Sequence, residues 1–255
     1  FDLHEQLAIK HDGARRWQYR KVDTYIVQLN MNGAINPHSK IADQEPLDWV
    51  RRELVEGIDQ MGATDNTAQV SPLEFTESIF FEAQSRGVEL KLGTVVDVVA
   101  STDSPHCSGE PVRRKYTIHL KDGELLFADK VVVACGAWSG AVQQWRVLKQ
   151  RHDFSPPAIP ILGLRAHSIV LRPRRQDLPP HCLFVEVSGT PYGGEDAIEV
   201  YPRTNGTVYI CGEALEPEDT PPEDPRNSIV KPGACEQLLN IVFQMSDDIK
   251  GAEVL

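Results

Sequence analysis

Ala128-Asp129-Lys130-Val131-Val132-Val133-Ala134-Cys135-Gly136-Ala137-Trp138-Ser139 is the stretch of sequence that decides the expected fold. Its residues 131–135 show no polar alternation, which is typical of a strand covered on both faces inside a parallel sheet. Small residues and Gly136 follow directly, so a ligand can approach the backbone where open α/β sheets place their ligands. From these residues alone, the stretch predicts either a simple turn or a contact with a cofactor.

The segments before this stretch predict both helices and strands. Residues 46–61 place apolar side chains at helical spacing, which predicts an amphipathic helix. Ser71-Pro72-Leu73-Glu74 combines an N-cap, a proline at the first helical position and a capping-box glutamate, and Gly87 is expected to end that helix. The other expected elements are strands in residues 88–92 and 94–99 and a hairpin of residues 116–120 and 125–127.

The segments after this stretch change character at the prolines of residues 155–160, where a domain boundary is expected. A helix is expected before the boundary at residues 140–150, and the spacing of apolar residues from Leu238 to Met245 predicts a last helix. Asn205-Gly206 predicts a hairpin turn, an interpretation preferred to its formal match to a glycosylation site. Short β-like runs predict an antiparallel sheet of residues 164–171, 182–187, 197–201 and 207–211.

Composition excludes several classes of protein. The 255 residues are 41% hydrophobic, enough for a sizeable core, and a formal net charge of -11 argues against a nucleic-acid partner. No apolar run is long enough to span a membrane, and the chain starts without a signal peptide or an initiator methionine, so we expect a cytoplasmic protein entered partway along its length. No Cys-x-x-Cys pair occurs, so neither a metal site nor a disulfide framework is expected from the five cysteines, Cys107, Cys135, Cys182, Cys211 and Cys235.

Two stretches carry a resemblance to a known family. Residues 129–139 resemble the A-D-x-V-V-x-A-x-G-A-W-S signature of the D-amino-acid-oxidase-like flavoproteins, the group of glycine oxidase and sarcosine oxidase. Tyr201-Pro202-Arg203, with Asn205-Gly206 and the following Ile210-Cys211-Gly212-Glu213, resembles the Y-x-P-R-x-D-G-x-V-x-x-G strand pair of the same family. The likeness spans roughly residues 47–213, and residues 164–170 resemble an uncharacterised intracellular branch of fungi and plants.

The resemblance implies a fold class and an activity. It implies an α/β (α+β) chain with a partial FAD-binding Rossmann-like domain at residues 1–155, an antiparallel β-rich substrate domain at 156–235, and the start of a return helix at 236–255. It also implies an FAD-dependent oxidoreductase that oxidises a C–N bond of a small-molecule amine or amino acid. The residues expected along FAD are Val95, at the adenine, and Ala134, Gly136 and Trp138.

The sequence departs from the family at the cofactor anchor. No G-x-G-x-x-G motif occurs in the chain, nor does a glycine-rich segment near residue 255. We therefore expect a fragment truncated at both ends that binds FAD weakly or not at all by itself, because the phosphates lack a helix N-terminus. A noncatalytic scaffold or interaction protein without flavin remains the alternative, and no catalytic residue or oligomeric state is identified.

Three further candidates were weighed. Tyr201 and Arg203 lie two apart on one strand and share a face, either as part of a plain sheet surface or as a pair facing the substrate. His167 lies in an alternating strand without a second histidine or a nearby carboxylate in sequence, which favours a structural or surface role over metal binding or base catalysis. Ser139 is one place late for the G-x-S-x-G elbow of hydrolases, and it is expected to be a helix N-cap.

Overall fold

The computed structural model describes residues 2–33, 47–100, 115–149, 159–161, 163–191, 196–214 and 221–255. The chain forms two compact units. The first contains Phe1–Val88, Ala166–Leu215 and Ile229–Leu255, and the second contains Glu89–Arg165 and Glu216–Ser228. The first unit therefore combines segments from both sides of the boundary expected near residue 155.

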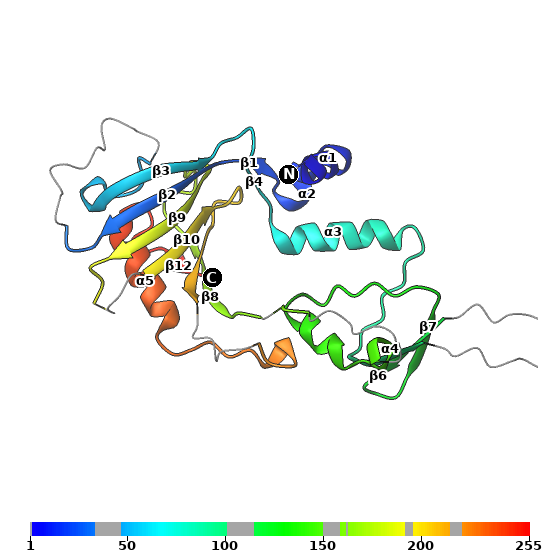
Figure 1. The fold of residues 1–255 in the computed structure, drawn as a ribbon. Coiled ribbons are helices and arrows are strands. Elements are labelled where there is room, and N and C mark those ends of the chain that lie inside the picture. Colours follow the sequence, from blue (N-terminus) through cyan, green and yellow to red (C-terminus); the bar gives the residue numbers. More distant parts are fainter. Residues whose placement is uncertain are drawn as a thin grey trace, which may run out of the picture. The chain divides into compact units, whose positions relative to one another are not determined.

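The first unit is organised around a seven-stranded sheet with the strand order β12-β8-β11-β10-β9-β2-β3 (Figure 1). Neighbouring strands run antiparallel, except that β2 pairs with β9 in parallel. The pairing of β2 with β9 places an early segment of the chain inside the later sheet. The strands are β2 (Asp23–Asn30), β3 (Val55–Gly62), β8 (Ala166–Arg172), β9 (His181–Ser188), β10 (Asp196–Pro202), β11 (Val208–Ala214) and β12 (Glu253–Val254).

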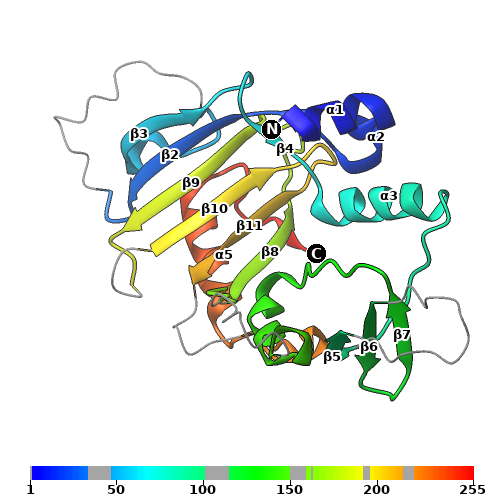
Figure 2. The same cartoon turned by 45° about the vertical axis from the view of Figure 1, so that its right-hand side comes forward.

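Helix α5 (Ala234–Met245) covers one face of this sheet, as Figure 2 shows. Its apolar stripe is buried, and alternate residues of the strands point toward it because successive side chains of a strand face opposite ways. The core on this side includes Leu183, Val185, Ile198, Val200, Ile210, Leu238, Ile241 and Met245. The intervening residues of the same strands face the other side of the sheet.

The described part of the first unit also contains three α-helices, a 3-10 helix and a short two-stranded sheet. Helix α3 begins after Ser71, and the Gly87 just beyond its end has φ +90°, so both predicted ends of this helix are confirmed. The Ser71 side chain makes no capping hydrogen bond. The elements are α1 (Asp2–His11), α2 (Gly13–Trp17), β1 (Arg20–Lys21), η1 (Arg52–Leu54), β4 (Ala68–Gln69) and α3 (Pro72–Gln84).

The second unit contains a three-stranded antiparallel sheet with the order β5-β6-β7. Val98, Val142 and Trp145 form its small buried core. Asp97 accepts a 2.8 Å hydrogen bond from the backbone N–H of Arg146 and pairs with the guanidinium of the same residue. The elements are β5 (Val95–Ala100), β6 (Tyr116–Leu120), β7 (Leu125–Ala128), η2 (Gly136–Gln144), α4 (Arg146–Lys149) and η3 (Pro225–Asn227).

Most of the predicted strands and hairpins are confirmed. The hairpin of β6 and β7 turns at Gly123, which has φ +92°, and the hairpin of β10 and β11 turns at Gly206, which has φ +78°. The four predicted runs of the antiparallel sheet correspond to β8, β9, β10 and β11, and the last predicted helix is α5. The helix expected at residues 140–150 is instead a 3-10 helix followed by the short α4, and Ser139 lies inside the 3-10 helix rather than at its cap.

Three further expectations were wrong. Residues 46–61 do not form a helix: the described part contains η1 and then β3, because pairing with β2 outweighs the local helical spacing. Residues 88–92 form no strand. Residues 131–135 are neither a strand nor buried, and Val132 is 89% exposed. No strand in the described part of the chain pairs with residues 131–135, and a strand needs a neighbour for its hydrogen bonds.

Candidate functional site

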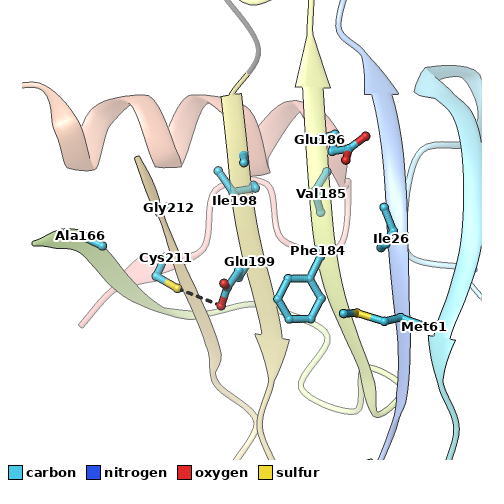
Figure 3. Close-up of a pocket in the computed structure, with 11 residues that line it drawn as sticks. Ile26, Met61, Ala166, Phe184, Val185, Glu186, Ile198, Glu199, Cys211 and Gly212 are labelled. Atoms are coloured by element: carbon cyan, nitrogen blue, oxygen red, sulfur yellow. Dashed lines mark hydrogen bonds between the residues drawn. The ribbon is translucent and has the colours of Figure 1, made fainter. Parts of the chain in front are cut away.

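A pocket of about 410 Å³ lies against the large sheet of the first unit. In Figure 3 its side chains stand in front of the strands, and α5 lies behind them. Its size falls within the usual range of small-molecule sites. The lining residues are Ile26, Met61, Ala166, Phe184, Val185, Glu186, Ala197, Ile198, Glu199, Cys211 and Gly212.

The floor of this pocket is a row of side chains that crosses four neighbouring strands. Cys211 of β11 is the register partner of Glu199 of β10, and Glu199 is the partner of Phe184 of β9. Phe184 is in turn the partner of Ile26 of β2. Directly opposed residues on one face have closely spaced side chains, so the pairing of the strands brings together residues that are far apart in sequence.

Glu199 is the polar centre of the row. The phenol of Tyr201 donates a hydrogen bond to Oε2 of Glu199, and the Cys211 thiol donates to the same oxygen over 3.5 Å. Burial raises the pKa of the Cys211 thiol to about 11, with a further contribution from Glu199, and burial likewise raises the pKa of Tyr201 well above its ordinary value. Both groups are therefore protonated near neutral pH and act as donors to Glu199.

Tyr201 and Arg203, the pair predicted to share a face, are connected through Tyr209 of β11. The rings of Tyr201 and Tyr209 stack with their centroids 6.1 Å apart, and the Arg203 guanidinium carbon lies 4.9 Å from the centroid of the Tyr209 ring. Burial lowers the pKa of Arg203, although interactions with Tyr209 and Glu74 act to raise it. Neither Tyr201 nor Arg203 lines the pocket, so Tyr201 acts on it through the hydrogen bond to Glu199.

The residues predicted to contact FAD lie in the second unit. Val95 opens β5 and is 37% exposed, and Ala134 is exposed in the irregular segment before η2. Gly136 begins η2 with φ +53°, and a Cβ added there would meet nothing within 4 Å. Trp138 is 37% exposed, and its indole Nε1 donates a 2.9 Å hydrogen bond to the carbonyl of Pro222. Their role at a cofactor remains a prediction.

Several exposed side chains of the second unit are apolar. Val95, Val96 and residues 131–133 are exposed and apolar, which suits the flat face of an adenine. The phosphates of FAD usually bind at a glycine-rich turn that opens a helix, and no G-x-G-x-x-G occurs in the sequence. The residues of this chain fit an apolar contact and do not fit the pyrophosphate.

His167 is buried in the first unit. It is 6% exposed on the α5 side of β8, and its Nε2 accepts a 2.9 Å hydrogen bond from the backbone N–H of Lys231. Among the described residues, no group of three or more His, Cys, Asp or Glu side chains is arranged to hold a metal ion. None of the helices in the described segments has the length and apolar character needed to cross a membrane.

Glu199, Phe184 and Cys211 line the pocket and were not predicted from the sequence. A signal for Glu199 was present, since it stands two residues before Tyr201 and therefore on the same face of the strand. The sequence holds no such signal for Phe184 and Ile26, because these residues become neighbours only through the parallel pairing of β2 with β9.

Comparison with known proteins defines the class of protein to which this fold belongs. Residues 9–253 match the family model described as FAD dependent oxidoreductase. The chain therefore belongs to this family, and the resemblance seen in the sequence is confirmed. The crystal structure of iminodiacetate oxidase (IdaA) from Chelativorans sp. BNC1 shares the mixed α/β fold, with a TM-score of 0.63 at 15% identity over 100% of this chain and 64% of that one.

Two fungal proteins are similar in sequence. The "Putative oxidoreductase TDA3" of Saccharomyces cerevisiae is 28% identical over 232 residues, which cover 82% of this chain and 41% of that protein. The "Putative oxidoreductase C1F5.03c" of Schizosaccharomyces pombe is 26% identical over 229 residues, which cover 84% of this chain and 52% of that protein. The chain thus spans about half the length of these curated relatives.

Proposed function

We propose that the protein containing this chain is an FAD-dependent enzyme that oxidises a C–N bond of a small-molecule amine or amino acid. The observation that carries the proposal is the pocket on the sheet of the first unit, where the carboxylates of Glu186 and Glu199 are set among apolar side chains. Membership of the FAD-dependent oxidoreductase family supports the use of FAD as the cofactor. FAD, when bound, supplies the acceptor for a hydride.

In this reaction the substrate loses two electrons and two protons, and a C–N single bond becomes a C=N bond, which water then hydrolyses to a carbonyl compound and ammonia, or to a carbonyl compound and an amine when the substrate nitrogen carries a second carbon. The part assigned to this chain is to hold and orient the substrate. Glu199 would hold the nitrogen end, and Phe184 and Ile26 would hold the apolar remainder. Val95, Ala134, Gly136 and Trp138 are proposed to contact the adenosine half of FAD.

The cytoplasm is the proposed compartment. Cys135, Cys182, Cys211 and Cys235, the cysteines in the described segments, are all free thiols, and free thiols persist where the redox environment is reducing.

The test is to purify the complete protein that contains this chain, measure flavin per polypeptide, and assay a panel of amines and amino acids for carbonyl product. The proposal predicts bound FAD together with turnover of at least one member of the panel. A protein that holds no flavin, or one that holds flavin and oxidises none of the panel while oxidising alcohols, contradicts it.

A further inference from the structure

The charge of the pocket distinguishes two kinds of substrate that the proposed function leaves open. An α-amino acid carries a carboxylate next to its ammonium group, whereas a simple alkylamine carries only the ammonium group. Glu186 and Glu199 are the charged side chains among the lining residues, and the rest are apolar side chains, one thiol and glycine. Among the described residues that line the pocket there is no Lys, Arg or His, so a carboxylate placed against these residues would meet two like charges and no cation.

Glu199 is arranged to accept one more donor. Both hydrogen bonds that the described residues give to Glu199 end on Oε2, which leaves Oε1 for a ligand. A carboxylate that is fixed by two neighbours has already lost much of its freedom to rotate, so binding an ammonium group costs little further ordering. A charge-assisted hydrogen bond of this kind is roughly twice as strong as a neutral one.

The side chains next to Glu199 favour an alkyl chain attached to the cation. Figure 3 shows Phe184 between Glu199 and Met61, with Ile26 on the next strand. The Phe184 ring packs against Tyr201 at a centroid distance of 6.2 Å and an interplanar angle of 84°. An aromatic ring beside the carboxylate attracts a cation through its face and buries adjacent methylene groups.

Arg203, the basic residue of the predicted Tyr201–Arg203 pair, does not line the pocket. It follows Tyr201 by two residues, so it stands four residues along from Glu199, a separation of about 13 Å at the usual rise of a strand. Its guanidinium lies over the Tyr209 ring. The Arg203 guanidinium is thus engaged at the Tyr209 ring and is not part of the pocket lining that contains Glu199.

We infer that the pocket binds an alkylammonium ion that lacks an α-carboxylate, with its nitrogen on Glu199 and its alkyl chain across Phe184 and Ile26. The inference rests on the proposed function in one respect: if the pocket serves that oxidation, the substrate is an amine rather than an amino acid.

Three probes with matched carbon chains test this inference by calorimetric titration of the complete protein. Pentylamine carries the ammonium group alone, norleucine is the same amine with an α-carboxylate added, and hexanoate carries the carboxylate alone. We expect pentylamine to bind at least about tenfold more tightly than norleucine, and hexanoate not to bind, since one unpaired or repelled charge outweighs the shared apolar contact. Norleucine binding as tightly as pentylamine, or no binding of pentylamine, overturns the inference.

The variant Glu199→Gln tests whether pentylamine binds in this pocket, because the substitution keeps the shape of the side chain and removes its charge. This substitution should weaken the binding of pentylamine about tenfold or more. Glu56→Gln is the matched control: Glu56 is an exposed residue of β3 that accepts a 2.9 Å hydrogen bond from Asn30 and does not line the pocket. Equal affinities in Glu199→Gln and Glu56→Gln, with both proteins folded, overturn the inference.

The titration and the turnover assay fail independently. Pentylamine that binds through Glu199 and yields no carbonyl product supports the binding site and contradicts the proposed function. Turnover of norleucine in preference to pentylamine supports the oxidation of C–N bonds and contradicts the inferred substrate class.

Discussion

The phenol of Tyr201 donates a hydrogen bond to the carboxylate of Glu199, which stands two residues earlier on the same strand. This bond holds Oε2 of Glu199 in place, so the carboxylate stays in the lining of the pocket. Because the Tyr201 ring also stacks with Tyr209 and packs against Phe184, the donor itself has little freedom to move.

Tyr201→Phe is expected to weaken pentylamine binding by roughly threefold to tenfold, because it removes the donor and keeps the stacked ring. The measurement is a titration of the complete protein. Tyr209→Phe retains the same stack and leaves the Tyr201 hydroxyl on Glu199 in place, so it should weaken pentylamine binding less than Tyr201→Phe, although the Tyr209 phenol bonds to the Cys211 thiol. An equal loss in both variants would assign the effect to the aromatic stack rather than to the hydrogen bond.

Leu183 and Phe184 are adjacent in β9 and face opposite sides of the sheet. Substitutions at these two positions should therefore affect stability and binding differently. Leu183 is fully buried in the core with α5, and Leu183→Ala should lower the free energy of unfolding by about 2–5 kcal/mol. Phe184 is only partly buried and lines the pocket, so Phe184→Ala should cost less stability and most of the pentylamine affinity. Urea unfolding and titration of both variants check this, and a larger stability loss in Phe184→Ala would contradict the assignment of faces.

Gly136→Val tests the predicted FAD contact in the complete protein. Its positive φ makes any side chain there cost about 1 kcal/mol or more. Gly123→Val is the matched control, since Gly123 has φ +92° and its added Cβ would also meet nothing within 4 Å. Gly163 does not serve as a control, because a Cβ there would lie 2.4 Å from Pro221. We expect less flavin per folded polypeptide in Gly136→Val than in Gly123→Val, measured after denaturing release, and equal flavin would remove Gly136 from the cofactor site.

Asp97 gives the second unit a pH-dependent contribution to stability. Burial alone would raise the pKa of Asp97, but hydrogen bonds and charge from Arg146 outweigh it and hold the pKa below its ordinary 3.8. The folded pKa is therefore lower than the unfolded one, so the contribution is present above about pH 4 and is lost as the pH falls through the folded value.

Asp97→Asn should accordingly destabilise the second unit by about 1–2 kcal/mol at pH 7 and approach the wild type in acid. The measurement is urea unfolding at several pH values. Asp129→Asn, at an exposed residue of the same unit, is expected to show no such difference. A destabilisation by Asp97→Asn that stays constant down to pH 3 would contradict the role of the charge.

The sequence predicted the elements whose signals are local. Proline and the capping residues defined α3, and Asn205-Gly206 defined the hairpin of β10 and β11. It failed where pairing between distant segments decides the outcome, as in β3, which forms a strand on β2 in place of the expected helix. The strand predicted at residues 131–135 was wrong for a related reason. No strand in the described segments pairs with these residues, so they form no ladder of hydrogen bonds.

The candidate site was predictable only in part. Tyr201 was found from its strand position, whereas Glu199 was overlooked although it shares the same face. Phe184 and Ile26 meet through a parallel pairing between residues more than a hundred positions apart, and no local pattern indicates such a contact.

The most direct test of the central claim is the reduction of bound flavin by pentylamine without oxygen. The complete protein is mixed anaerobically with pentylamine, and the visible absorbance of its flavin is followed in the wild type and in Glu199→Gln. The account predicts loss of the oxidised flavin absorbance in the wild type, with Glu199→Gln requiring about tenfold more pentylamine for the same rate. Flavin that stays oxidised in the wild type at saturating pentylamine, or equal concentration dependence in the two proteins, would contradict it.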